Sequence, residues 1–229
     1  MKIHGLQKLT LLDYPGTVAC TVFLGGCDFR CPYCHNAELL DPDFPPLMDE
    51  RELLSFLRKR QGMLDGVCIT GGEPLLRQDL PDLLQEIRAL GYKIKIDTNG
   101  ARPGRLNSIM AAGLADYVAM DIKNSPERYA ETIGRADFDL SPVRESVRLL
   151  MAGSTDYEFR TTVVAGLHGE EDIRSIGRWI TGAKRYYLQP FTDRETVPAA
   201  GLSAPGKSQL ERFLSIAREY VPETELRGV

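Results

Sequence analysis

The chain has 229 residues, of which 43% are hydrophobic and 26% are charged, and its formal net charge is −4. This composition is typical of a globular protein with one sizeable core, and no apolar run reaches the roughly 20 residues that a membrane-spanning helix needs. The mild negative charge and the lack of a basic block exclude the electrostatic signature of a nucleic-acid-binding protein. The first residues lack the hydrophobic region of a signal peptide, so we expect a cytoplasmic protein without a membrane partner.

Apolar segments bounded by turn residues predict six β-strands. The first strand follows a turn at residues 13–16 and ends directly before a cysteine-rich loop. The predicted strands, in chain order, cover residues 18–24, 66–70, 92–97, 117–120, 158–164 and 185–189.

Helices are predicted between these strands from apolar residues at helical spacing and from capping residues. Asp49 is the expected N-cap of the first helix. The predicted helices, in chain order, cover residues 50–60, 80–90, 103–112, one segment opened by Ser125-Pro126, one opened by Ser141-Pro142, 173–180 and 205–220. Strands and helices that alternate without a hairpin signal imply parallel strands with right-handed crossovers. The periodicity alone leaves two architectures open, a doubly wound sheet and an α/β barrel.

Three cysteines with the spacing C-x3-C-x2-C, namely Cys27, Cys31 and Cys34, follow the first predicted strand. Three thiolates on one loop can bind three irons of a [4Fe–4S] cluster, which usually takes four cysteines, and this leaves one iron open. A zinc site that includes His35 is the alternative, although structural zinc sites usually draw their ligands from two separated segments. The other two cysteines lie in apolar runs, and we expect them to be buried without a ligand role: Cys20 and Cys68.

This spacing, with the aromatic Tyr33 just before the last cysteine, resembles the signature of the radical S-adenosylmethionine (SAM) superfamily. The resemblance implies a radical SAM oxidoreductase in which the amino and carboxylate groups of SAM chelate the open iron. The reduced cluster then passes one electron to the sulfonium, and the resulting 5′-deoxyadenosyl radical abstracts hydrogen. The resemblance also favours a partial (β/α)6 barrel of the TIM type, with parallel strands, over a doubly wound sheet.

Further candidate residues follow the predicted strands, where active sites of α/β barrels lie. Gly71, Gly72 and Glu73 could form only a turn, but a backbone without side chains and a carboxylate can also accept hydrogen bonds from an ammonium group. They resemble the segment of the family that holds the amino group of SAM, and Tyr33 is expected to lie against the adenine. The resemblance assigns further SAM contacts to Thr98, Asn99, Asp121, Lys123 and Arg160, and Gln189 could supply a polar group from the end of the sixth predicted strand.

Asp97 and Asp121 resemble the residues that supply oxygens to a monovalent cation beside the SAM carboxylate in pyruvate formate-lyase activating enzyme. Carboxylates that converge there repel one another unless a cation or Lys123 lies between them. The alternatives are that Asp121 and Lys123 form a solvated strand end and that Arg160 is a salt-bridged or edge-strand residue. The same enzymes carry a histidine where this chain has Thr192. Of the remaining histidines, His168 is expected to be an exposed loop residue.

The resemblance is closest to activating enzymes of glycyl radical enzymes, and among them to those that act on anaerobic ribonucleoside-triphosphate reductase. It extends from residue 9 to residue 192. It implies a single domain over residues 1–229, with a core of about 17–192 and a C-terminal helix at about 205–220. The expected partners are a glycyl radical enzyme and a flavodoxin- or ferredoxin-like electron donor. The segment expected near the docked target peptide is Asp13, Tyr14, Pro15 and Gly16, where Tyr14 replaces the usual glycine.

Two other functions remain open at this stage. One is a radical SAM enzyme that acts on a small molecule, similar to carboxy-deazaguanine synthase, and turnover of a purine-like substrate without a protein partner would select it. The other is an iron–sulfur or zinc binding module without chemistry, which SAM cleavage by the reduced protein would eliminate.

Overall fold

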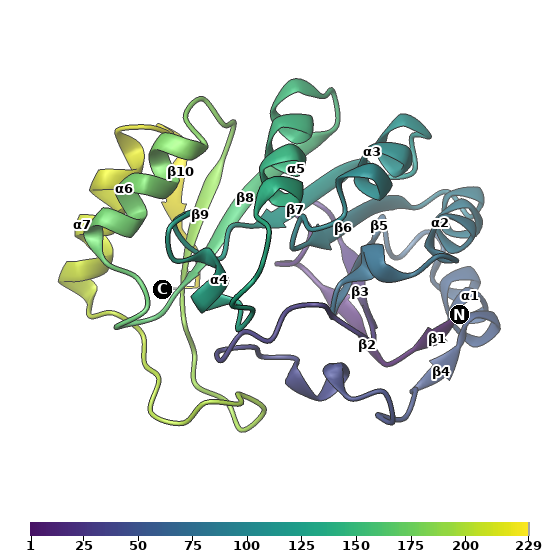
Figure 1. Ribbon diagram of the computed structural model, residues 1–229. Coiled ribbons are helices and arrows are strands. Elements are labelled where there is room, and N and C mark those ends of the chain that lie inside the picture. Colours follow the sequence, from purple (N-terminus) through teal and green to yellow (C-terminus); the bar gives the residue numbers. More distant parts are fainter. Residues whose placement is uncertain (229) are drawn as a thin grey trace. The chain divides into compact units, whose positions relative to one another are not determined.

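The computed structural model describes residues 1–228, which fall into two compact units (Figure 1). The first unit comprises Met1–Asp28, Asn36–Thr98 and Arg102–Val118, and the second comprises Phe29–His35, Asn99–Ala101 and the chain from Ala119 onward. Both contain parallel strands followed by helices, which confirms the predicted α/β class. That the whole chain forms one domain stays a prediction.

The sheet of the first unit has the strand order β2-β3-β5-β6. Its strands are β2 (Gly5–Thr10), β3 (Ala19–Leu24), β5 (Gly66–Gly71) and β6 (Lys93–Thr98). As predicted, β3, β5 and β6 are parallel, with Ala19 opposite Gly66 and Gly66 opposite Lys93. Strand β2 lies outside the six predicted strands, and it runs antiparallel to β3. A separate two-stranded sheet pairs β1 (Lys2–Ile3) with β4 (Met48–Asp49).

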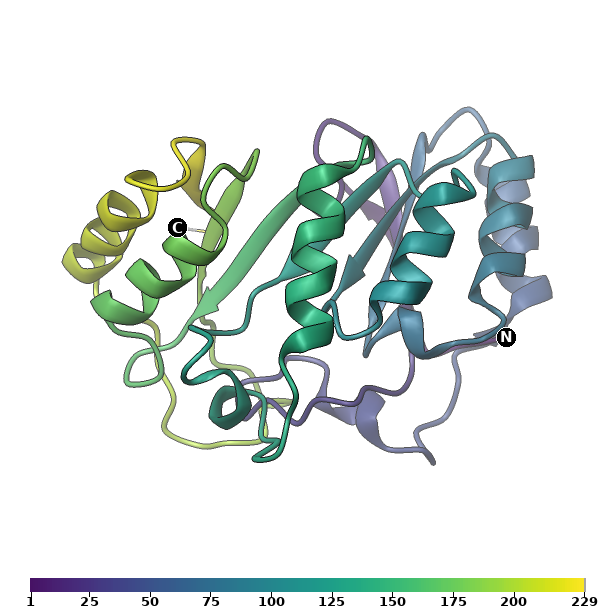
Figure 2. The ribbon, with the colours of Figure 1, turned by 45° about the horizontal axis from the view of Figure 1, so that its top comes forward.

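The helices of the first unit lie side by side along its strands (Figures 1 and 2). They are α1 (Glu50–Arg60), α2 (Leu80–Ala89) and α3 (Pro103–Ala111), with short 3-10 turns η1 (Ala37–Leu40) and η2 (Pro74–Leu76). The cap predicted for α1 is present, because Asp49 accepts a hydrogen bond from the Glu52 N–H and the Glu52 carboxylate accepts one from the Asp49 N–H, both at 2.9 Å. The leucines of α1 and α2 at helical spacing are buried, as their pattern predicted.

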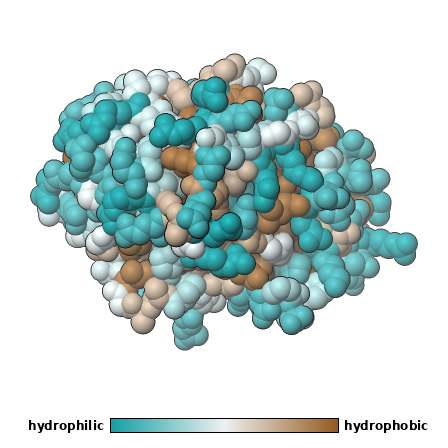
Figure 3. Space-filling model, in the orientation of Figure 1, coloured by the Kyte–Doolittle hydropathy of each residue, from teal (hydrophilic) through white to brown (hydrophobic). Residues whose placement is uncertain are grey.

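The second unit has the strand order β7-β8-β9-β10. Its strands are β7 (Tyr117–Asp121, which begins in the first unit), β8 (Asp156–Val163), β9 (Tyr186–Pro190) and β10 (Thr224–Leu226). Strands β8, β9 and β10 are parallel, with Phe159 and Thr224 on either side of Tyr186. Its helices are α4 (Tyr129–Thr132), α5 (Ser141–Ala152), α6 (Glu170–Trp179) and α7 (Lys207–Arg218). The surface over α6 and α7 is mostly hydrophilic (Figure 3), as expected for helices that bury one face.

The two Ser-Pro segments differ from the prediction. The first does not open a helix but enters a turn, and α4 begins later and has only four residues. The reason is that the Ser125 hydroxyl donates a hydrogen bond to Asp172 at 2.7 Å and does not cap a helix. Helix α5 does begin at Ser141, but its N-cap residue is Leu140 and no side chain caps it; the Ser141 N–H donates to the Asp139 carboxylate at 2.9 Å.

Within the described residues, no helix combines the length and the apolar character needed to cross a bilayer.

Candidate active site

The cysteine loop begins where β3 ends. Gly26 has a positive φ of 91°, and its N–H donates to the Leu39 carbonyl at 2.7 Å, which turns the chain away from the strand. Cys27 follows on the first unit and is half-buried. The loop therefore leaves the carboxyl end of β3, where the alternation of strands and helices predicts an active site.

The remaining two cysteines form a turn of the second unit, in which the Cys34 N–H donates to the Cys31 carbonyl at 3.2 Å. Cys31 is 8% exposed, and burial raises the pKa of its thiol to about 11 although the nearby Lys123 charge acts to lower it. The residue before this turn is bound to the segment after α4, because the Arg30 N–H donates to the Ile133 carbonyl at 2.8 Å. The two segments pack so closely that a Cβ on Gly134 would lie 2.5 Å from the Arg30 oxygen.

Three thiolates on one loop are the donor set of an iron–sulfur cluster. Among residues 1–228, no group of three or more His, Cys, Asp and Glu side chains adopts the arrangement of a metal site. The assignment of Cys27, Cys31 and Cys34 to a cluster therefore rests on their chemistry and spacing and stays a prediction.

Tyr33 is buried in the second unit with 4% of its surface exposed. Its hydroxyl lies 3.5 Å from the Lys123 carbonyl, and its ring meets that of His168 edge to face at 6.4 Å. His168 was expected to be exposed, and this is wrong: it is 2% exposed. Its Nδ1 accepts from the Val164 N–H at 3.1 Å, which leaves Nε2 to donate to the Lys123 carbonyl at 2.9 Å. The two rings thus fix the backbone at Lys123. The contact of Tyr33 with adenine stays a prediction.

Asp121, at the carboxyl end of β7, holds two cations through its two oxygens. Arg160 Nε donates to Oδ1 and Lys123 Nζ donates to Oδ2, each at 2.9 Å. Burial acts to raise the pKa of Asp121, but the two positive charges outweigh it and lower the pKa to about 2. Burial likewise acts to lower the pKa of Lys123, and the Asp121 charge raises it well above the usual value. The salt-bridged interpretation of Arg160 is confirmed, whereas the SAM contacts of these three residues stay predictions.

The Gly71-Gly72-Glu73 segment follows β5 and lies against the cysteine loop within the first unit. The Gly72 N–H donates to the Leu24 carbonyl at 2.8 Å, and the Glu73 N–H donates to the Gly26 carbonyl at 2.7 Å. A Cβ on Gly72 would lie 1.9 Å from the Gly26 oxygen, and one on Gly71, where φ is 119°, would lie 2.4 Å from the Leu24 backbone. Both glycines are required for this close backbone approach.

Glu73 is 1% exposed, and its Oε1 accepts hydrogen bonds from the Leu75 N–H at 3.0 Å and from the Thr98 hydroxyl at 2.8 Å. Glu73 and Thr98 therefore brace each other at the ends of β5 and β6. Asn99 stabilises the next turn, because its Oδ1 accepts from the Ala101 N–H at 2.9 Å. The predicted SAM contacts of Glu73, Thr98 and Asn99 stay predictions.

The sequence analysis missed a buried ion pair next to these residues. Lys95 is 1% exposed, and its Nζ donates a short hydrogen bond to Asp97 Oδ1. Cys68 is buried as predicted, but its Sγ lies 3.8 Å from the Lys95 ammonium and 3.7 Å from Asp97 Oδ1. The spacing of Lys95 and Asp97 could have predicted this pair, because residues two apart on a strand lie on the same face of the sheet.

Gln189 lies on β9 opposite Thr162 and is half-buried. The Thr192 carbonyl lies 2.7 Å from His35 Nε2. The His35 ring also stacks on Phe191 with centroids 5.5 Å apart and planes 8° apart. The chain thus brings a histidine from the cysteine loop to this segment, which the sequence analysis did not predict. A SAM contact of Gln189 stays a prediction.

The segment Asp13 to Gly16 lies at the other end of β3. Asp13 accepts a hydrogen bond from the Thr21 hydroxyl at 2.6 Å. Tyr14 is 4% exposed, and its ring lies 6.0 Å from that of Tyr117 and beneath Gly66, the first residue of β5. Tyr14 therefore serves as a packing residue at the amino ends of the strands, and peptide docking by this segment stays a prediction.

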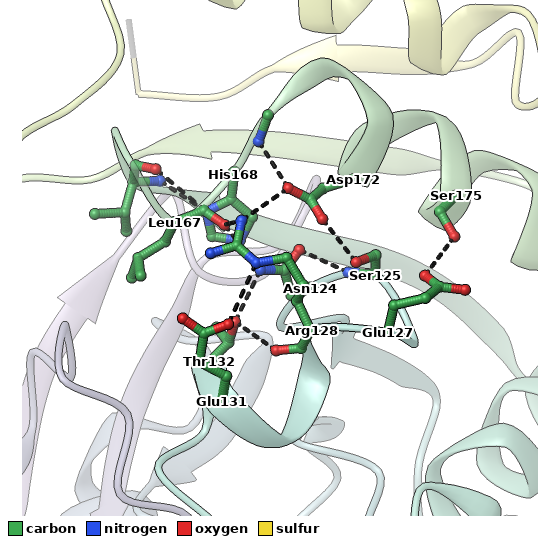
Figure 4. Close-up of polar contacts among 12 residues, drawn as sticks. Asn124, Ser125, Glu127, Arg128, Glu131, Thr132, Leu167, His168, Asp172 and Ser175 are labelled. Carbon is green, nitrogen blue, oxygen red and sulfur yellow. Dashed lines mark hydrogen bonds and ion pairs between the residues drawn. The ribbon is translucent and has the colours of Figure 1, made fainter.

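A polar network fixes the chain that follows Lys123 (Figure 4). Asp172, at the start of α6, accepts hydrogen bonds from the Gly169 N–H at 2.9 Å, the Ser125 hydroxyl at 2.7 Å and Arg128 Nη1 at 3.1 Å. Asn124 Nδ2 donates to the Leu167 carbonyl at 2.9 Å. The loop after β7 is thereby tied to the loop before α6 within the second unit.

Comparison with known proteins gives a matching family model, similar proteins and similar solved structures. Residues 21–178 match the family model described as the radical SAM superfamily. The chain is 28% identical, over 99% of its length and 96% of the relative's, to a Methanocaldococcus jannaschii protein whose name assigns it provisionally to the glycyl-radical enzyme activating enzymes. A pyruvate formate-lyase-activating enzyme of Staphylococcus epidermidis is 26% identical over 82% of this chain and 80% of its own. The solved structure of Streptococcus suis SuiB bound to precursor peptide SuiA matches with a TM-score of 0.72 and 14% identity, over 91% of this chain and 48% of that one.

The structural likeness gives the fold: the parallel strands and their helices form the partial (β/α)6 barrel that the sequence analysis preferred to a doubly wound sheet. The matched family region includes the C-x3-C-x2-C loop, the two glycines packed against it and the ion pairs at the end of β7. Because that region makes up more than half of the sequence, the chain belongs to the radical SAM superfamily.

Proposed function

We propose that this radical SAM enzyme activates a glycyl radical enzyme, and that its partner is anaerobic ribonucleoside-triphosphate reductase. The observation that carries the activation reaction is the similarity to the archaeal relative, whose name assigns it to the glycyl-radical enzyme activating enzymes and which matches over 99% of this chain and 96% of its own. The similarity to a pyruvate formate-lyase-activating enzyme over 82% of the chain supports the same class of reaction.

In this proposal Cys27, Cys31 and Cys34 hold a [4Fe–4S] cluster, and Gly71 and Gly72 bring backbone close to it. When bound, the cluster supplies one electron, taken from a flavodoxin- or ferredoxin-like donor, which breaks a carbon–sulfur bond of SAM and leaves methionine and a 5′-deoxyadenosyl radical. That radical takes a hydrogen atom from a glycine Cα of the partner and becomes 5′-deoxyadenosine, and the glycine keeps the unpaired electron.

The contribution of this chain is to bind and orient SAM. Lys123 and Arg160, held by Asp121, are charged donors for the SAM carboxylate, and the buried Tyr33 and His168 rings keep Lys123 in place. A backbone glycine suits the reaction because no side chain blocks its Cα and because its radical is delocalised over the neighbouring amides. The bound precursor peptide in the SuiB structure supports a peptide as substrate for this fold. The monovalent cation predicted at Asp97 and Asp121 is not part of the proposal, since each carboxylate holds cations of the chain.

The test is to mix the anaerobically reconstituted, reduced protein with SAM and the reductase from the same organism. We expect a doublet glycyl radical signal in electron paramagnetic resonance, which disappears when the reductase glycine becomes alanine. SAM cleavage without a glycyl radical on any glycyl radical enzyme of the organism contradicts the proposal and favours a small-molecule substrate. No SAM cleavage at all favours a binding module.

A further inference from the structure

We propose that Lys95 takes the place of a monovalent metal cation at Asp97, so that this protein binds SAM without K⁺ or Na⁺. The inference rests on the proposed SAM site and does not depend on which partner is activated. It disagrees with the cation that the resemblance to pyruvate formate-lyase activating enzyme implies, and the disagreement comes from residues of this chain.

Lys95 is a fully enclosed cation. Its side chain is 1% exposed, and that of Asp97 is 14% exposed. An ammonium taken out of water is strongly disfavoured unless an anion and further acceptors compensate it. Lys95 Nζ has Asp97 Oδ1 as its anion, and the Cys68 sulfur lies 3.8 Å away. The register of β5 and β6 places Cys68 directly opposite Lys95, so the pair is positioned by two neighbouring strands of the sheet and not by a loop.

A second cation on the same carboxylate would meet this ammonium. A metal ion bound to Asp97 Oδ1 would share that oxygen with Lys95 Nζ. At a separation of about 4 Å, two like charges at an effective dielectric constant of about 20 weaken binding on the order of a thousandfold. Asp97 thus has its counter-ion within the chain, and a metal ion there would have to displace a buried side chain.

The other carboxylate of the implied cation site is also compensated within its own unit. Asp121 Oδ1 accepts from Arg160 Nε and Oδ2 accepts from Lys123 Nζ, both at 2.9 Å. Both oxygens are therefore directed at protein cations. Oxygen ligands that a metal ion needs are therefore bound to protein cations: Oδ1 of Asp97 to an ammonium, and both oxygens of Asp121 to an ammonium and a guanidinium.

The test uses the reconstituted holoprotein with its cluster. SAM affinity and the thermal midpoint are measured in KCl, NaCl and choline chloride at equal ionic strength, so that screening does not differ. We expect the wild-type affinity to stay within about twofold among the three salts. Lys95→Met keeps the length of the side chain and removes the charge, and we expect its SAM affinity to be at least about tenfold weaker in choline chloride than in KCl, because Asp97 then recruits a metal ion. Lys93→Met, on the same strand but exposed, is the matched control and is expected to behave as wild type.

Binding of ²⁰⁵Tl⁺, a potassium analogue visible by NMR, gives a readout that does not depend on activity. The proposal expects no bound thallium in the wild type and one bound ion in Lys95→Met. A wild type that binds thallium, or that loses about tenfold or more in SAM affinity in choline chloride, overturns the proposal even if the variant does not fold. A folded Lys95→Met protein that shows no cation dependence overturns it as well. None of these outcomes involves a glycyl radical, so they are separate from a failure of the proposed activation reaction.

Discussion

The five cysteines divide into two kinds by their surroundings. Cys27, Cys31 and Cys34 lie on the loop after β3, whereas Cys20 and Cys68 are fully buried within β3 and β5. Cys20 lies in the middle of the hydrogen-bonded pairing of β3 with β5, away from the loop that carries the other three thiols. The Cys68 sulfur lies beside the ion pair of Lys95 and Asp97 and not on the cysteine loop.

We therefore predict that alanine substitutions separate the two kinds. Cys27→Ala, Cys31→Ala and Cys34→Ala are each expected to lose nearly all cluster iron after anaerobic reconstitution, and Cys20→Ala and Cys68→Ala are expected to retain it. Iron and sulfide are counted per chain, with circular dichroism as the control for folding. A folded Cys68→Ala protein without iron would refute the assignment.

The glycines after β5 allow a second prediction at single positions. Gly72→Ala puts a Cβ 1.9 Å from the Gly26 oxygen, and this backbone atom cannot move away as a flexible side chain could. We therefore expect the free energy of unfolding to fall by at least roughly 2 kcal/mol, and SAM binding to weaken by at least roughly 2 kcal/mol. Gly104→Ala is the matched control: nothing lies within 4 Å of the added atom, and alanine in the first turn of α3 should be neutral or stabilise by up to about 1 kcal/mol. Chemical denaturation and SAM titration measure both variants. A stable, SAM-binding Gly72→Ala protein would show that the observed backbone approach is not required.

Among the elements, α6 is notable because its N-terminal carboxylate also holds the loop after β7. Burial acts to raise the pKa of Asp172, but the Gly169 N–H, the Ser125 hydroxyl and Arg128 outweigh it and lower the pKa. A carboxyl group with a lowered pKa in the folded state stabilises the protein fully above its usual pKa of about 3.9, and this stabilisation is lost as the pH falls through the lowered value.

We predict that Asp172→Asn lowers the free energy of unfolding by about 1–2 kcal/mol at neutral pH, because the cap and the contact with Arg128 are weakened. The difference from wild type should shrink as the pH falls below about 4, since the wild-type carboxylate is then protonated. Urea unfolding of the cluster-free protein over this pH range measures it. Glu131→Gln, which removes an exposed partner of Arg128, is the control and should change stability by less than about 0.5 kcal/mol. A pH-independent difference would contradict the role given to the carboxylate.

Elements with a strong local signal were predictable from the sequence. Asp49 predicted the cap of α1, and the leucines of α2 predicted its buried face. The elements that were missed depend on distant partners. Strand β2 is largely exposed to solvent and is stabilised by pairing with the edge of β3. Strand β10 has three residues, too few to show an alternation of apolar and polar side chains. The Ser125 hydroxyl could have capped a helix, but Asp172, 47 residues away, accepts its hydrogen bond.

For the molecule as a whole, motif spacing located the cysteine loop and the family, but it could not tell which charges pair. Arg160 and Lys123 were predicted as SAM contacts, and the structure shows that both are bound to Asp121. Lys95 carried no motif, and only the register of β5 and β6 reveals it beside Asp97 and Cys68. His168 does lie in a loop, but it was expected to be exposed because the backbone groups that bind its ring, the Val164 N–H and the Lys123 carbonyl, cannot be placed beside it from the sequence.

The most direct test of the proposed function is to measure whether the hydrogen that converts the 5′-deoxyadenosyl radical into 5′-deoxyadenosine comes from a glycine Cα of the reductase. The reductase is produced with glycine deuterated at Cα and mixed with the reduced protein and SAM in ordinary water without oxygen, and the 5′-deoxyadenosine is analysed by mass spectrometry. The account predicts that 5′-deoxyadenosine gains one deuterium, in proportion to the glycyl radical formed, and that a reductase with alanine at the radical glycine gives none. Formation of 5′-deoxyadenosine that carries no deuterium, at the same rate with and without the reductase, would contradict it.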